Sequence, residues 1–160
     1  MTAPFTLTSP AFNNNDTLPL AQVHNGAGGA NRSPELHWAN PPAGTKSFAL
    51  TCYDPDAPTG SGFWHWYIIN LPADVHSLAE NAAVDGLPAG ARHGRNDYGD
   101  YSYGGACPPP GHGAHRYIFT IHALDCDHLD LPQDVTTARI GFTVWQHSLG
   151  SASLTATFGR

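Results

Sequence analysis

Four short segments in which strand-forming residues are concentrated constrain the fold of this chain more than any other feature. They are residues 46–53, 64–70, 116–123 and 152–158. In the first, Phe48, Leu50 and Cys52 alternate with smaller or polar residues, a period of two that is typical of a half-buried β-strand. The second, WHWYIIN, consists almost entirely of aromatic and β-branched residues, which favour strands. We therefore predict that these segments, with a short opening strand at 5–9, form β-sheets.

Two further segments are predicted to be helical. Residues 74–81 can form a short helix, and apolar residues recur at helical spacing over 135–149, although β-branched residues between them oppose a helix. The recurring residues are Val135, Ala138, Phe142, Trp145 and Leu149. Glycine and proline supply 17 and 14 of the 160 residues while 41% are hydrophobic, which indicates many turns in a folded chain. This length suits one mainly β domain, residues 1–160.

The composition excludes several classes of protein. Seven basic against thirteen acidic residues give a formal charge of −6, so nucleic acid, which needs a basic surface, is not an expected partner. The apolar runs are far shorter than the roughly 20 residues of a transmembrane segment, and the first ten residues lack a signal-peptide pattern. Cys52, Cys107 and Cys126 are too widely spaced for a disulfide framework or a CxxC zinc site. We therefore expect reduced thiols and a cytoplasmic location.

The DPDAP segment, residues 54–58, carries two carboxylates at the end of a predicted strand. Asp54 and Asp56 are two residues apart, so in an extended backbone they lie on the same side. His65 lies between two tryptophans in an apolar strand, where a polar ring needs a partner. A carboxylate partner would fix the tautomer of His65 and favour its protonated form. Taken alone, the two carboxylates are equally compatible with a solvated turn, and His65 with a core histidine.

A second candidate region is residues 103–117, YGGACPPPGHGAHRY. Three consecutive prolines fix the backbone there, and the surrounding glycines allow close approach. The loop leads into a strand on which His115 and Tyr117 share one face. Backbone N–H groups, an imidazole and a phenol that converge with His65 would bind a small oxyanion such as phosphate. The alternative is an edge loop whose histidine and tyrosine only pack.

Metal binding and nucleophilic catalysis are other interpretations of these residues. His112 and His115 are three residues apart, but on a Pro/Gly loop this spacing does not place both rings on one helical face, and no HExxH motif occurs. Ser61 lacks the GxSxG elbow. Cys107 could act as a thiolate near His115, or could simply line the loop. No GxxxxGK[ST] motif is present. We expect no enzymatic activity, no metal and no cofactor.

Two motifs of this sequence are highly specific: the DPDAP segment followed by HW at 65–66, and the proline loop ending in HRY at 115–117. NRSPELHW at 31–38 and PAGTKSFAL at 42–50 support them. Together they resemble the phosphatidylethanolamine-binding protein family, most closely its bacterial branch, which is often labelled kinase-inhibitor-like. The resemblance runs in order from residue 5 to residue 158.

This resemblance implies a fold and a site. The fold is a β-sandwich-like pair of packed antiparallel sheets with a few short helices, and the site is a surface pocket for phosphate-like anions, including phospholipid head groups. Carried over position by position, the pocket residues are Asp54, Asp56, His65, Cys107, Pro108, Pro109, His115 and Tyr117.

The expected function is that of a non-enzymatic binding protein for such anions. The alternative is a regulatory inhibitor of a kinase or serine protease that acts through the same surface, and a likeness of fold does not separate the two. Charged residues make up only 12% of the chain, and bacterial relatives are often described as pairs. We therefore also expect a symmetric homodimer.

Overall fold

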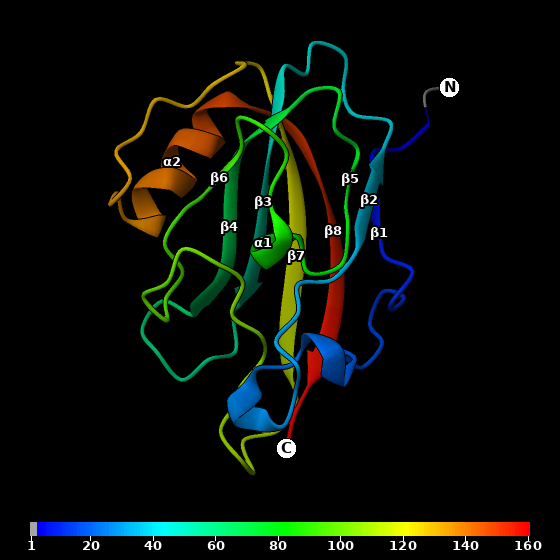
Figure 1. Ribbon diagram of the computed structural model, residues 1–160, viewed down its shortest axis with the longest axis vertical. Helices are drawn as coiled ribbons and strands as arrows, with labels where there is room; N and C mark the ends of the chain where they lie inside the picture. The colour runs from blue at the N-terminus through cyan, green and yellow to red at the C-terminus, as the bar shows by residue number, and fades with distance from the viewer. Residues whose placement is uncertain (1–2) are drawn as a thin grey trace.

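The computed structural model describes residues 3–160, which form two antiparallel sheets (Figure 1). The larger sheet has the order β6-β4-β3-β7-β8 and the smaller one β1-β2-β5. The larger sheet contains β3 (Ser47–Asp54), β4 (Phe63–Pro72), β6 (Arg92–His93), β7 (His115–Leu124) and β8 (Ser148–Phe158). The smaller sheet contains β1 (Thr6–Thr8), β2 (Leu36–Ala39) and β5 (Ser77–Leu78). The predicted mainly β fold with two antiparallel sheets is thus confirmed.

Apolar side chains are buried on both faces of the larger sheet. On β3, Phe48 belongs to the core shared with the smaller sheet, where its ring meets that of Trp38 at a centroid distance of 5.8 Å. The next residue, Ala49, points to the opposite face and packs with Ile140 of helix α2 (Thr137–His147). Because both faces are covered, β4 is apolar along most of its length instead of alternating.

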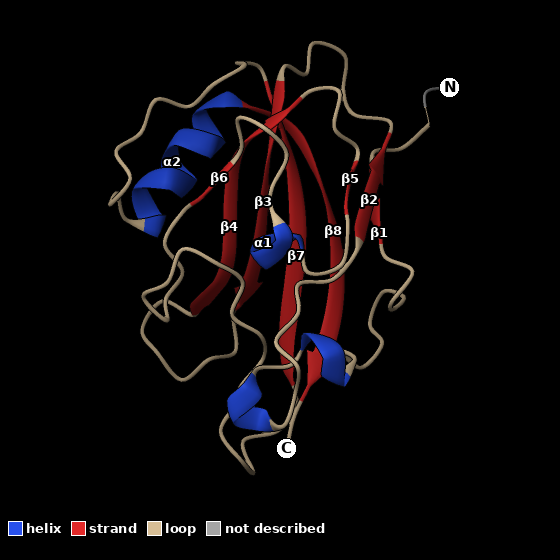
Figure 2. Ribbon diagram, in the orientation of Figure 1, coloured by secondary structure: helices blue, strands red, loops and turns tan. Residues whose placement is uncertain are grey.

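Helical structure is confined to short elements (Figure 2). They are η1 (Leu20–Gln22), η2 (Asn25–Ala27), α1 (Ala82–Asp85) and α2. The predicted helix over 135–149 is confirmed as α2, but a different face is buried: Ile140 and Val144 contact the core, whereas Phe142 and Trp145 are exposed. Within residues 3–160, no helix is long and apolar enough to cross a membrane.

The helix predicted over residues 74–81 is wrong. That segment contains β5, in which Leu78 pairs with Leu36 and Ser77 with His37. Leu78 is buried and Ser77 is exposed, the alternation expected of an edge strand. Pairing with β2 therefore outweighs a weak local preference for helix, and α1 begins only after this segment.

One end of the larger sheet brings together segments that are far apart in the sequence. β3 lies between β4 and β7, and both neighbours run antiparallel to it. Asp54, the last residue of β3, therefore lies close to the start of β4 and to the start of β7. The first residue of β7 is His115.

A β-bulge in β4 modifies this end of the sheet. Tyr53 pairs with Trp64, whereas the preceding residue, Cys52, pairs with Trp66, so that His65 is the extra residue. A bulge redirects a side chain and is common beside functional sites.

Candidate functional site

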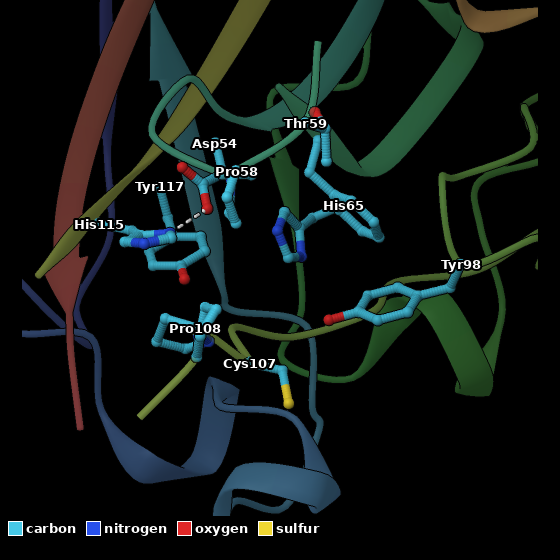
Figure 3. Close-up of a pocket in the computed structure, with 12 residues that line it drawn as sticks. Asp54, Pro58, Thr59, His65, Tyr98, Cys107, Pro108, His115 and Tyr117 are labelled. Atoms are coloured by element: carbon cyan, nitrogen blue, oxygen red, sulfur yellow. Dashed lines mark hydrogen bonds and ion pairs between the residues drawn. The ribbon is translucent and has the colours of Figure 1, made fainter. Parts of the chain in front are cut away.

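A cavity of about 180 Å³ opens at this end of the larger sheet (Figure 3). Seven of the eight predicted pocket residues line it, namely Asp54, His65, Cys107, Pro108, Pro109, His115 and Tyr117. The lining also includes residues that the sequence did not indicate as site residues: Ala57, Pro58, Thr59, Phe63 and Tyr98. Asp56, the eighth predicted residue, is not part of the lining.

Asp54 and His115 form a buried hydrogen-bonded pair in the pocket wall. Oδ2 of Asp54 accepts from Nδ1 of His115 at 2.7 Å, and both side chains are only 3% exposed. Oδ1 accepts from the backbone N–H of Asp56 at 2.7 Å. Because a carboxylate only accepts, Nδ1 of His115 carries a proton, and Nε2 of the neutral ring is an acceptor. Nε2 lies 2.6 Å from Nδ1 of the exposed His112, which extends the pair to the surface.

His65 does not have the predicted carboxylate partner. Its Nδ1 donates to the backbone carbonyl of Gly104 at 2.8 Å, while both oxygens of Asp54 bind other groups. Burial lowers the pKa of His65, although the Gly104 carbonyl and the nearby Asp54 partly oppose this effect. The predicted carboxylate partner is therefore wrong, and burial favours the neutral ring, whose Nε2 accepts until a proton arrives.

Asp56 lies outside the pocket and fixes the start of β7. Its Oδ2 accepts from the backbone N and the Nε of Arg116 at 2.9 and 3.0 Å, and its Oδ1 accepts from Nη2 at 2.9 Å. These hydrogen bonds lower the pKa of Asp56 to about 2. The backbone turns directly after Asp54, so the extended geometry that would place both carboxylates on one side does not occur.

Close backbone contacts shape the loop that precedes the prolines. Gly104 N–H donates to the carbonyl of His65 at 3.0 Å, and Gly105 N–H donates to Oδ1 of Asn31 at 2.7 Å. A Cβ atom on Gly105 would lie 2.3 Å from the carbonyl oxygen of Gln22, so only glycine fits at this position. The loop is therefore tied both to β4 and to the chain around residue 31.

Tyr98 is a pocket residue that no sequence pattern indicated, because it lies in a loop without periodicity. Its hydroxyl donates to the carbonyl of Gly105 at 2.8 Å. Its ring meets those of Phe63 and His65 edge-on, at centroid distances of 4.7 and 5.6 Å. Burial raises the pKa of Tyr98 and that of Tyr117, so both hydroxyls remain neutral hydrogen-bond donors.

Cys107 lies at the edge of the pocket beside a positive charge. Nη2 of Arg160 is 3.7 Å from its Sγ, and Nε of the same guanidinium donates to the carbonyl of Pro108 at 2.8 Å. The guanidinium of Arg160 thus places a full positive charge at the rim of the pocket.

Several known proteins are similar to this chain over nearly its whole length. Residues 8–159 match the family model described as phosphatidylethanolamine-binding protein. The UPF0098 protein YbhB of Escherichia coli is 50% identical over 156 residues, which cover 95% of this chain and 98% of that protein. The crystal structure of E. coli YbcL, titled as a new member of the mammalian PEBP family, has a TM-score of 0.94 and 42% identity, with 99% of both chains covered. A Mycobacterium tuberculosis protein with a lipoprotein name, LppC, is 35% identical over 155 residues, which cover 97% of this chain and 72% of that protein. The chain therefore belongs to the phosphatidylethanolamine-binding protein family.

Proposed function

We propose that this protein is a non-enzymatic binding protein whose pocket takes a phosphate-like anion, either a phosphate monoester or a phospholipid head group. The observation that carries the proposal is the presence of two buried imidazoles, His65 and His115, on one small cavity. Each ring is held through Nδ1 by an acceptor. His65 therefore gains a charged donor at Nε2 when it takes up a proton, and His115 offers its Nε2 to the anion once the ring of His112, 2.6 Å away, turns aside. The hydroxyl of Tyr117 supplies a neutral donor.

The size and the remaining lining of the cavity support a small ligand. Its volume of about 180 Å³ lies below the roughly 300 to 1,000 Å³ of pockets for drug-sized molecules. A phosphoryl group with a short substituent fits such a volume, whereas acyl chains would remain outside. Pro58, Phe63 and Pro108 offer apolar contact to the substituent, and Arg160 lies at the rim.

Binding of sulfate is expected to weaken as the pH rises from about 5.5 to 8, by up to about tenfold per pH unit for each proton taken up. Burial lowers the pKa of His65, so the ring is neutral in the free protein and must gain a proton to bind an anion. Sulfate keeps its charge over this range, so the change reports the protein alone. Isothermal titration calorimetry measures this change in affinity, and inorganic phosphate and phosphoethanolamine are titrated in parallel. Affinity that does not depend on pH would contradict the proposed role of the imidazoles.

A pull-down beside these titrations separates the proposal from the inhibitor hypothesis. A regulatory inhibitor of a kinase or protease would be recovered with a stable partner in a fixed ratio, whether or not the pocket binds phosphate. Binding of phosphate or phosphoethanolamine without such a partner favours the anion-binding function.

We also propose that the protein forms a symmetric homodimer. Charged residues make up 12% of the chain, and α2 leaves Phe142 and Trp145 59% and 72% exposed, with ring centroids 5.8 Å apart. Adjoining exposed aromatic residues are typical of surfaces that bind another protein. Light scattering at micromolar concentration is expected to give twice the 17.0 kDa mass of one chain, and a mass of 17.0 kDa would contradict the dimer.

The proposed location is the cytoplasm. Cys52, Cys107 and Cys126 are all free thiols, which suits a reducing compartment. The mycobacterial relative, in contrast, is named a lipoprotein. Fractionation of the native host tests the location of this protein.

A further inference from the structure

Three potential metal ligands converge at the end of the larger sheet opposite the pocket. They are Asp125, Cys126 and His147, whose ligand atoms all lie within 4.8 Å of one another. Oδ1 of Asp125 accepts from Nδ1 of His147 at 2.8 Å. β7 begins at the pocket and ends at Leu124, so its length of about 30 Å separates the cluster from the pocket. Figure 1 shows the two ends of β7, with the end of α2 and the start of β8 near the upper one.

The backbone holds these side chains in place before any ion arrives. Asp125 N–H donates to the carbonyl of His147 at 3.0 Å, which ties the end of β7 to the last residue of α2. The following turn is held by Asn70, whose Oδ1 accepts from Leu129 N–H at 2.7 Å and whose Nδ2 donates to the carbonyl of Leu129 at 3.4 Å. Two segments that are 22 residues apart in the sequence are thus fixed against each other, as a preorganised site requires.

We propose that Asp125, Cys126 and His147 bind one divalent transition-metal ion of the zinc type. Bonds of about 2.0 to 2.3 Å in a tetrahedral zinc site place ligand atoms roughly 3.3 to 3.8 Å apart, so small side-chain rotations would complete this one. A thiolate, an imidazole and a carboxylate suit zinc or cobalt, whereas calcium and magnesium prefer oxygen ligands. The side chains of Asp125 and His147 are 51% and 40% exposed, so an ion can enter from solvent.

Proton transfers accompany the binding. The thiol of Cys126 releases its proton to solvent on forming the metal–sulfur bond. The ring of His147 gives up the Nδ1 proton that it donates to Asp125 and carries a proton on Nε2 instead, which frees Nδ1 for the metal. Water occupies the fourth position. The ion replaces an exposed ion pair, which by itself contributes little to stability.

The expectation that the chain binds no metal rested on the spacing of His112 and His115 and on the absence of HExxH and CxxC motifs, none of which involves these three residues. Asp125 and Cys126 are neighbours, but their histidine partner comes from a distant helix end. No local spacing motif therefore indicates the site, and only the fold brings the three residues together.

The test uses the full-length protein, stripped with a chelator and titrated with Co²⁺. One equivalent is expected to produce a thiolate-to-cobalt absorption band in the near ultraviolet, and added Zn²⁺ is expected to remove it. Cys126→Ser is expected to abolish the band, and His147→Gln to weaken Co²⁺ binding at least about tenfold, as the loss of a metal-supporting group does. Both residues lie near the surface, and circular dichroism verifies that the variants fold.

Matched variants distinguish this cluster from the pocket. Cys107→Ser removes the other half-buried thiol, and His112→Gln removes half of the histidine pair beside His115; both are expected to keep the band. Cys126→Ser is expected to keep the phosphate affinity of the unmodified protein, so failure of this site and failure of the proposed function are separate results. A band that survives in Cys126→Ser, a band lost in Cys107→Ser, or no stoichiometric binding of Co²⁺ would each overturn the proposal.

Discussion

Replacing Asp54 with alanine is expected to lower the free energy of unfolding by about 2 to 6 kcal/mol, because two buried donors each lose an acceptor at a cost of roughly 1 to 3 kcal/mol. The carboxylate is 3% exposed and accepts hydrogen bonds from both His115 and the backbone of Asp56. Without it, a buried imidazole N–H and a backbone N–H lose their acceptor. Urea unfolding, followed by tryptophan fluorescence, measures the change.

The neighbouring carboxylate provides the control for this experiment. Asp56→Ala removes an ion pair whose side chains, Asp56 and Arg116, are 31% and 56% exposed, so we expect a change of at most about 1 kcal/mol. Because Arg116 holds the pKa of Asp56 at about 2, this small contribution is present above about pH 4 and disappears as the pH falls toward 2. Equal losses for the two alanine variants at pH 7 would disprove the assignment of Asp54 as the buried partner.

A double variant tests the pairing of Asp54 with His115. If Asp54 acts mainly by compensating His115, removing both side chains leaves no unpaired imidazole in the pocket wall. The effects of Asp54→Ala and His115→Ala are then less than additive. Strict additivity would show that the two residues stabilise the fold independently.

Replacing His65 with alanine is expected to weaken phosphate binding about 10- to 150-fold, the equivalent of a charge-assisted hydrogen bond worth roughly 1.5 to 3 kcal/mol. The ring lines the cavity and is fixed by Gly104, so its loss removes one of the two imidazole donors. Isothermal titration calorimetry near pH 6 gives the largest signal, because the proton that the ring must gain is then most readily available.

His122 offers a matched control for this variant. It also lies in the larger sheet, on β7, and burial lowers its pKa to about 4, but it does not line the cavity. His122→Ala is expected to leave phosphate affinity unchanged. If His65→Ala bound phosphate as tightly as the unmodified protein, the anion could not contact the ring.

The long strands could be predicted because each carries its own signal. The segments 46–53 and 116–123 coincide with β3 and β7 to within one residue at each end. The strands β2, β5 and β6, of four, two and two residues, are too short for a period to be visible, and they exist only because a partner strand is adjacent. In α2 the helical period was visible in the sequence, but the buried face was not. Ile140 and Val144 make the tertiary contacts, and as β-branched residues they had argued against a helix.

The candidate site could likewise be predicted only in part. The identities of His65, His115 and Tyr117 could be anticipated because histidines and a tyrosine at the ends of apolar strands are unusual and match a family motif. The pairing of each carboxylate with its partner could not be anticipated, because the turn after Asp54 and the bulge at His65 are set by strand register. Tyr98 and Arg160 reach the pocket region from a loop and from the last position of the chain, where sequence offers no period to follow.

The bulge at His65 also separates the end of β4 that lines the pocket from the part of β4 that packs in the core. From Trp66 to Ile68, β4 keeps the alternation that packs both faces of the larger sheet, whereas Phe63 and Trp64 follow the register set by Asp54 and Tyr53. An extra residue absorbed at this point leaves the facing of the side chains from Trp66 to Ile68 intact, although a one-residue slip would otherwise reverse it. A change in the length of the turn before β4 can therefore be absorbed at the bulge without turning Trp66 away from the core.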